Sequence, residues 1–67
     1  MLLIKKDVFM YLLAKKGKSK AGACRELNIS VNTVNNWLHR GTKTSLGKAM
    51  YVSEYLEVEL EEVFSPA

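Results

Sequence analysis

Residues that usually carry catalysis or bind metals are scarce in this 67-residue sequence, which has one cysteine, one histidine and one aspartate. The single thiol, Cys24, excludes an intrachain disulfide framework and a zinc site built from cysteines. The single imidazole, His39, excludes a histidine-rich metal site. With Asp7 as the only aspartate, no catalytic triad can be assembled. We therefore expect a protein that is not an enzyme, with no metal, no cofactor and no small-molecule substrate.

Long hydrophobic runs are also missing. The opening MLLI is apolar but is followed at once by Lys5, Lys6 and Asp7. A signal-peptide core needs at least about seven apolar residues, and a membrane helix needs about twenty. We therefore expect a cytoplasmic protein without a membrane partner. Proline occurs once and the four glycines are scattered, so no linker divides the chain, and residues 1–67 are expected to form one domain with a small core.

The charges are distributed unevenly along the chain. Residues 1–50 carry all ten Lys and Arg against Asp7 and Glu26, a net charge of +8, whereas residues 51–67 carry five Glu, a net charge of −5, which together give the overall +3. A basic front and an acidic tail indicate a polyanionic partner that meets one face of the molecule. A solvated surface with uneven charge is the alternative.

The apolar spacing predicts helices in the first part of the chain. Asp7 is expected to cap a first helix that runs to about Lys16 and ends at Gly17. The preceding MLLIK either extends this helix or forms a short strand. Ser19 is expected to cap a second helix that runs to about Leu27.

Three further helices are expected after a tight turn. Asn28 suits the left-handed backbone region, where asparagine is tolerated better than most residues, and Ile29 follows as a buried plug. Ser30 is a good N-cap for a third helix over residues 31–39. After a polar loop, TKT, either Ser45 or Thr44 caps a fourth helix over residues 46–56, and a last short helix covers about residues 59–64.

The third predicted helix is rich in asparagine, which is a mediocre helix former. On a helical wheel, Asn32, Asn35, Asn36 and His39 form one polar stripe, and the opposite side carries Val34, Trp37 and Leu38. Trp37 is therefore expected in the core, with the amides outside. A carboxamide donates and accepts at once, which matches the edge that adenine exposes in the major groove. The alternative is a solvated face.

The stretch SKAGACRELNISVNTVNNWLHRG resembles the helix-turn-helix of the lambda-repressor/Cro-like (xenobiotic-response-element) family. The resemblance extends over nearly the whole chain: LNIS looks like the family's turn, TVNNWLHRG like its recognition helix, and SLGKAMYVSEYLEVELEEVF like its last two helices. It implies a compact, all-α, five-helix domain in which helices two and three form the helix-turn-helix. Three residues depart from the pattern. Asn28 stands for the usual Gly, Lys18 for an apolar residue, and Lys20 for a Gln. Lys20 is expected to keep the affinity for phosphate but to lose the Gln side chain's bridge to a base or to its neighbour.

Position by position, the resemblance implies which residues touch DNA. Base edges are contacted by Val31, Asn32, Asn35 and Asn36. Phosphates are contacted by Ser19, Lys20, Ser30, Thr33, His39, Arg40 and Lys43. The matching buried positions are Ala23, Leu27, Ile29, Val34 and Trp37, with Cys24 as inert packing where two helices touch.

These observations together predict a sequence-specific, double-stranded-DNA-binding transcriptional regulator of the phage or prophage Cro/repressor type. One module makes only three or four base contacts, so a homodimer on a two-fold operator is expected. The resemblance places the self-contact around residues 58–64. The alternative is a helix-turn-helix protein-interaction module, of the antitoxin or anti-repressor type, that binds another regulator. A non-specific nucleoid binder is a second alternative.

Overall fold

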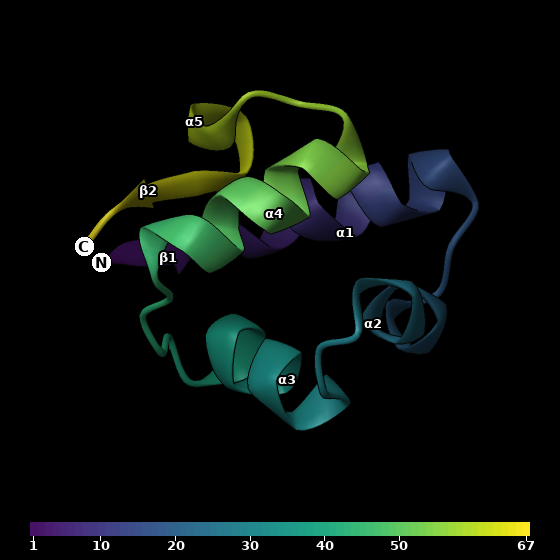
Figure 1. Cartoon of the computed structure of the whole chain (residues 1–67), viewed down its shortest axis with the longest axis horizontal. Coiled ribbons are helices and arrows are strands. Elements are labelled where there is room, and N and C mark those ends of the chain that lie inside the picture. Colours follow the sequence, from purple (N-terminus) through teal and green to yellow (C-terminus); the bar gives the residue numbers. More distant parts are fainter.

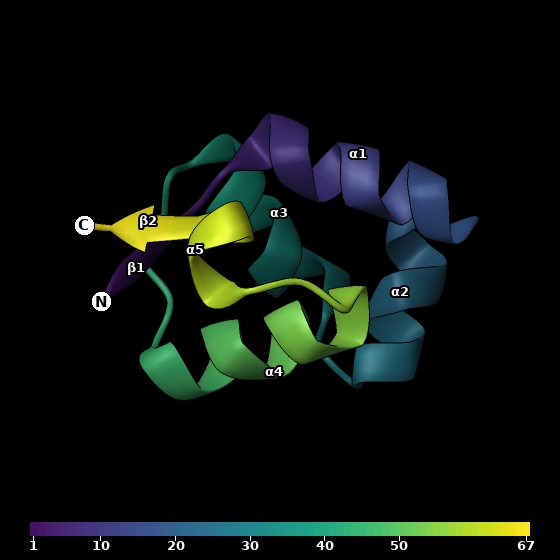
Figure 2. The same ribbon diagram turned by 90° about the horizontal axis from the view of Figure 1, so that it is seen from above.

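Five helices and one small sheet make up the computed structural model, which describes all residues 1–67. In chain order, the elements are β1 (Leu2–Ile4), α1 (Lys6–Lys16), α2 (Lys20–Leu27), α3 (Val31–His39), α4 (Leu46–Leu56), α5 (Leu60–Val63) and β2 (Phe64–Pro66). Figure 1 shows α1 and α4 in a central layer, with α5 on one side and α2 and α3 on the other. The strands and both termini lie at one end of the molecule, and α2 lies at the other (Figure 2). No helix has both the length and the apolar character needed to cross a bilayer.

The two ends of the chain form a β-sheet, which corrects the prediction of an all-α fold. Strand β1 pairs antiparallel with β2, with Leu2 opposite Pro66 and Ile4 opposite Phe64. Of the two alternatives for the opening residues, the short strand is therefore right. The pairing satisfies backbone groups at both ends, and alternate residues of β1, Leu2 and Ile4, pack against the core. Local periodicity gives no sign of a partner strand at the far end of the chain.

Helix α1 begins two residues earlier than predicted. Its N-cap is Lys5, which makes no side-chain cap, and Asp7 lies inside the first turn. The prediction that Asp7 caps this helix is therefore wrong, although a carboxylate in the first turn still favours the helix dipole. The cause is the sheet, because the Lys5 N–H donates to the carbonyl of Val63 at 2.8 Å and the chain enters the helix directly from β1. Gly17 ends α1 in the left-handed region, at φ 74°, as predicted.

The loop before α4 has a polar sequence, but its last residue, Thr44, is buried. Thr44 is only 3% exposed, and its backbone N–H and carbonyl bond to Leu2 at 2.8 and 2.9 Å. Its hydroxyl has no hydrogen-bond partner within the chain. Ser45, rather than Thr44, caps α4, with its Oγ accepting from the N–H of Lys48 at 3.3 Å.

The core collects side chains from every helix and from β2. Its members are Phe9, Leu13, Ala23, Cys24, Leu27, Val34, Trp37, Leu38, Ala49, Val52, Leu56, Val63 and Phe64. The rings of Trp37 and Phe64 meet edge to face, 6.4 Å apart and at 77°. Trp37 is thus buried as predicted, and burial raises the pKa of the Cys24 thiol. Ile29 is half-buried against this cluster, whereas Leu46 and Met50 of α4 point to solvent.

Polar contacts join α2 to α4 and to the connection that precedes α2. The Tyr51 hydroxyl donates to the carbonyl of Leu27 at the end of α2, at 2.9 Å. The Glu26 carboxylate accepts from the Lys18 ammonium at 2.8 Å and from the Tyr55 hydroxyl. These bonds, that from Lys18 first, lower the pKa of Glu26. Desolvation and the bond to Glu26 raise the pKa of Tyr55 to about 12.

Acidification is expected to remove the stabilisation that this network gives. A carboxylate with a lowered pKa in the folded chain stabilises it above the unfolded value, here the ordinary 4.5. That contribution disappears as the pH falls through the folded value. Glu26→Gln should therefore flatten the acid limb of the stability profile, measured by thermal unfolding at neutral and at acid pH. The same acid dependence in both proteins would contradict this assignment.

Candidate nucleic-acid interface

Two residues that precede α3, Asn28 and Ser30, fix where this helix begins. Asn28 ends α2 in the left-handed region, at φ 59° and ψ 41°, as predicted. The chain then reverses into α3, where the Ser30 Oγ accepts from the N–H of Thr33 at 3.1 Å. This cap satisfies one of the free N–H groups at the helix start. The turn and the cap together set the direction in which α3 leaves α2.

The two sides of α3 have opposite characters. Val34, Trp37 and Leu38 are buried, with exposed fractions of 1%, 4% and 8%. On the outer side, Asn32 and Asn36 are exposed, and their side chains make no hydrogen bond within the chain. Because packing fixes the buried side of the helix, the outer side presents a row of polar groups to solvent.

The four predicted base-contact residues lie on this helix, but one of them is engaged. Val31 is 38% exposed at the start of α3, beside the free amides of Asn32 and Asn36. Asn35 is half-buried, and its Oδ1 accepts a hydrogen bond from the Nζ of Lys20 at 2.5 Å. The expectation that Lys20 has lost the bridging role of Gln is therefore wrong, because Lys20 bridges from α2 to α3.

Apart from Lys20, which bonds to Asn35, the predicted phosphate-contact residues fall into two groups. The hydroxyls of Ser19, Ser30 and Thr33 take part in helix caps: Ser19 Oγ accepts from the N–H of Gly22 at 3.0 Å, and the hydroxyls of Ser30 and Thr33 lie 2.9 Å apart. The second group is His39, Arg40 and Lys43, which are exposed at and after the end of α3. Their side chains have no hydrogen-bond or ion-pair partner in the chain.

The ion pairs of the chain leave the cations near α3 free. The two ion pairs join Lys18 to Glu26 at 2.8 Å and Lys16 to Glu57 at 3.6 Å. Neither uses a predicted phosphate-contact residue. Helix α5, with Glu61 and Glu62 in its first turn, lies across the α1/α4 layer from α3 (Figure 1). The acidic part of the chain is thus kept away from the asparagine face.

Comparison with known domains assigns the segment that contains this geometry. Residues 8–43 match the model of the homeodomain-like domain, a stretch that includes nearly all of α1, all of α2 and α3, and part of the following loop. The chain belongs to the homeodomain-like family. Helix α3 is therefore the third helix of the homeodomain-like domain and the second helix of its helix-turn-helix. Helices α4 and α5 and both strands lie outside the matched segment. This match does not confirm the more specific resemblance to the lambda-repressor/Cro-like family.

A solved structure shares the whole fold. The crystal structure of a "putative DNA-binding protein from Bacteroides fragilis" superposes with a TM-score of 0.72 and 23% sequence identity, and the alignment covers 97% of this chain and 100% of that chain. No curated protein sequence matches this chain. The same arrangement of α1, α2 and α3 with α4 and α5 thus occurs in a solved structure that aligns over its full length.

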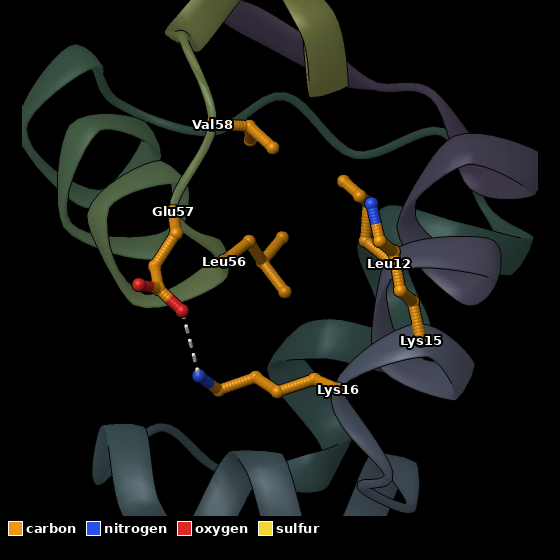
Figure 3. A pocket seen from close by; sticks show the side chains of 6 residues that line it. All are labelled: Leu12, Lys15, Lys16, Leu56, Glu57 and Val58. Atoms are coloured by element: carbon orange, nitrogen blue, oxygen red, sulfur yellow. Dashed lines mark ion pairs between the residues drawn. The ribbon is translucent and has the colours of Figure 1, made fainter.

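A hollow on another part of the surface was not foreseen from the sequence. It has a volume of about 320 Å³ and is lined by Leu12, Lys15, Lys16, Leu56, Glu57 and Val58. Figure 3 shows the Lys16–Glu57 ion pair crossing one side of it. The Lys16 ammonium also lies 4.9 Å from the centre of the Tyr55 ring. These contacts join α1 to the end of α4. No group of three or more His, Cys, Asp or Glu side chains in the molecule is placed to hold a metal ion.

Proposed function

We propose that this homeodomain-like chain is a sequence-specific, double-stranded-DNA-binding transcriptional regulator that reads the major groove with α3. The observation that carries the proposal is the exposed, unpartnered pair of carboxamides, Asn32 and Asn36, on a helix whose other side is anchored by Trp37. The major groove admits an α-helix, and asparagine pairs with both polar atoms of the adenine edge. Homeodomains place their third helix in this groove.

The charges around α3 support the same proposal. Lys20 at the start of α2 bonds to Asn35 in the middle of α3, and the cations Arg40 and Lys43 follow the end of α3, where His39 is the last residue. Positive side chains therefore lie beside the asparagine face and at its C-terminal end. Each cation that contacts a phosphate releases condensed counterions and steepens the salt dependence of binding by about one unit of log-log slope. The acidic α5 on the far side favours one orientation of the domain on the duplex.

The finer parts of the proposal concern assembly and role. We expect a cytoplasmic regulator of the Cro/repressor type, not an enzyme, that binds a two-fold operator as a homodimer, because one module reads too few bases to be selective alone. The self-contact predicted over residues 58–64 needs correction, because Val63 and Phe64 are buried in the chain's own core. Val58 and Leu60, which are half-buried, remain available with the exposed Leu46 and Met50 of α4.

A protein-interaction module is the second candidate, and one surface feature favours it. A shallow groove of about 190 Å³ between α4 and α5 is lined by Met50, Ser53, Glu54, Val58, Glu59 and Leu60. Its three apolar residues and two glutamates suit a protein segment better than a nucleic acid. In this case the groove, rather than the asparagine face, would carry the binding.

Selection from a random pool of DNA duplexes tests the proposal. The selected duplex and a scrambled one are then titrated by fluorescence anisotropy at low and at near-physiological salt. We expect a two-fold motif that binds at least about a thousand-fold more tightly than the scrambled duplex. Equal binding of both duplexes that vanishes as salt rises would show charge attraction alone and would refute sequence-specific regulation.

A further inference from the structure

The connection that follows α3 is anchored first to α3 itself. The backbone carbonyl of Asn36 accepts the N–H groups of both Arg40 and Thr42, at 3.0 and 3.2 Å. Gly41, which lies between them, has a φ of 63°, a left-handed conformation that turns the chain out of the helix. The start of the connection is therefore fixed to a residue whose amide is proposed to read a base.

The far end of the same connection is anchored to β1. Thr44 and Leu2 exchange both backbone hydrogen bonds, at 2.8 and 2.9 Å, which is the pattern of an antiparallel pair. Along its other edge β1 is paired with β2, where the carbonyl of Met1 accepts the N–H of Ala67 at 3.2 Å. Figures 1 and 2 show the connection between α3 and α4 passing beside β1. The strand therefore lies between the exit of α3 and the last strand of the chain and is bonded to both.

The backbone bridge, rather than the Thr44 side chain, holds this end of the connection. Thr44 is buried, yet its hydroxyl has no hydrogen-bond partner within the chain. A buried hydroxyl without a partner is unfavourable, so this group does not help to fix the residue. The polar contacts that place Thr44 are thus its two bonds to Leu2.

Lys43 lies between the two anchors. It is exposed, and its ammonium has no hydrogen-bond or ion-pair partner in the chain. The residues on either side of it, Thr42 and Thr44, both donate their backbone N–H groups to carbonyls of other elements. The backbone at Lys43 is therefore held in place while its charge is free.

We propose, on the basis of the proposed function, that β1 is a positioning strand for DNA binding, because its bridge from Leu2 to Thr44 holds Lys43 where a phosphate meets the exit of α3. Phosphate contacts fix the register and orientation of a protein on the duplex. A connection that is already ordered loses little conformational entropy when its cation meets a phosphate, whereas a free connection must be ordered on binding. Since the same connection begins at Asn36, the bridge also keeps the phosphate contact and the base-reading helix in one fixed relation.

A single substitution breaks the bridge. In Thr44→Pro the N–H is lost, and a ring carbon takes the place of the hydrogen that points at the Leu2 carbonyl, which pushes the two segments apart. Binding to the selected and the scrambled duplex is measured by fluorescence anisotropy over a salt series. We expect weaker binding to both duplexes with the ratio between them unchanged, and a salt slope lower by up to about one unit, the share of one phosphate contact.

Thr44→Val is the matched control at the same position. It removes the unpartnered hydroxyl but keeps the N–H that donates to Leu2, so it should bind both duplexes as the wild type does. Urea unfolding defines the conditions under which each variant is folded, and binding is compared under those conditions. A loss of affinity in Thr44→Val equal to that in Thr44→Pro would show that the bridge is not the cause.

A double-variant cycle separates positioning from general damage. Lys43→Met alone should lower the salt slope by about one unit. If the bridge acts through Lys43, Thr44→Pro combined with Lys43→Met should bind no more weakly than Lys43→Met alone, because contributions of coupled residues are not additive. Effects that add in full would overturn the inference.

Amide hydrogen exchange tests the bridge without DNA and without a variant. The N–H of Thr44 donates to Leu2, whereas that of Lys43 makes no backbone hydrogen bond. We therefore expect slower exchange at Thr44 than at Lys43 in the wild type. Equal exchange at the two positions would overturn the inference even if Thr44→Pro does not fold.

The DNA results distinguish this inference from the proposed function. If the wild type selects a motif and Thr44→Pro binds it with the same affinity and salt slope, the positioning role is refuted and the regulator proposal stands. If the wild type selects no motif, the regulator proposal is refuted. The salt slope on the scrambled duplex then still shows whether the bridge acts on Lys43, and a wild type that binds no duplex refutes both.

Discussion

Replacement of Trp37 by alanine is expected to destabilise the domain by about 3–5 kcal/mol, the usual cost of removing a buried tryptophan. Trp37 is 4% exposed and meets Phe64 edge to face, at 6.4 Å. It thereby joins α3, the helix proposed to read DNA, to the strand that closes the chain. A domain of this size is stable by only about 0.05–0.15 kcal/mol per residue. The 67 residues are therefore stable by only about 3–10 kcal/mol in total, and the variant should lose from about a third to all of that stability.

Urea unfolding followed by far-UV circular dichroism measures this effect. Tyr11→Ala is the matched control, because it also removes a large aromatic side chain, but one that is 64% exposed. A surface substitution of this kind changes stability by less than about 0.5 kcal/mol. If Trp37→Ala loses no more than Tyr11→Ala, the assignment of Trp37 as the anchor of α3 is wrong.

The helices could be predicted because their signals are local. Ser19 and Ser30 cap α2 and α3 through bonds to an N–H three residues further on, and Gly17 and Asn28 end α1 and α2 in the left-handed region. Each signal depends on backbone conformation within one turn. For the same reason, the observed α3, Val31–His39, coincides with the range expected from its wheel.

Contacts between distant parts of the chain could not be predicted in the same way. The sheet pairs Ile4 with Phe64, and it moves the N-cap of α1 from the predicted Asp7 to Lys5. The burial of Thr44 has the same origin, since its backbone bonds to Leu2. Propensity within a short window contains no information on such partners, so these positions were assigned by local polarity alone.

In the candidate site too, the features set by local sequence could be predicted and the contacts between helices could not. The wheel places Asn32 and Asn36 outside and Trp37 inside, and both assignments agree with the structure. The bond between Lys20 and Asn35 depends on how α2 crosses α3 and on the rotamers of two long side chains. Only the folded helix pair reveals that one of the asparagines is engaged.

Replacement of both Asn32 and Asn36 by alanine is expected to abolish discrimination between operator and scrambled DNA. Each lost bidentate contact costs about 1–3 kcal/mol, so the double variant should bind the two duplexes within about tenfold of each other. Because both amides are uncharged, the slope of log affinity against log salt should stay the same. Anisotropy titrations of both duplexes over a salt series measure these quantities together.

Unfolding cannot account for such a loss, because alanine is a better helix former than asparagine by up to about 0.7 kcal/mol per residue. The double variant should therefore unfold at the same or a higher urea concentration than the wild type. Lys43→Met provides the opposite pattern, a salt slope lower by about one unit with discrimination retained. A double variant that still prefers the operator would show that α3 does not read bases through these amides. A protein partner whose binding is undisturbed by the same two substitutions would instead favour the groove between α4 and α5.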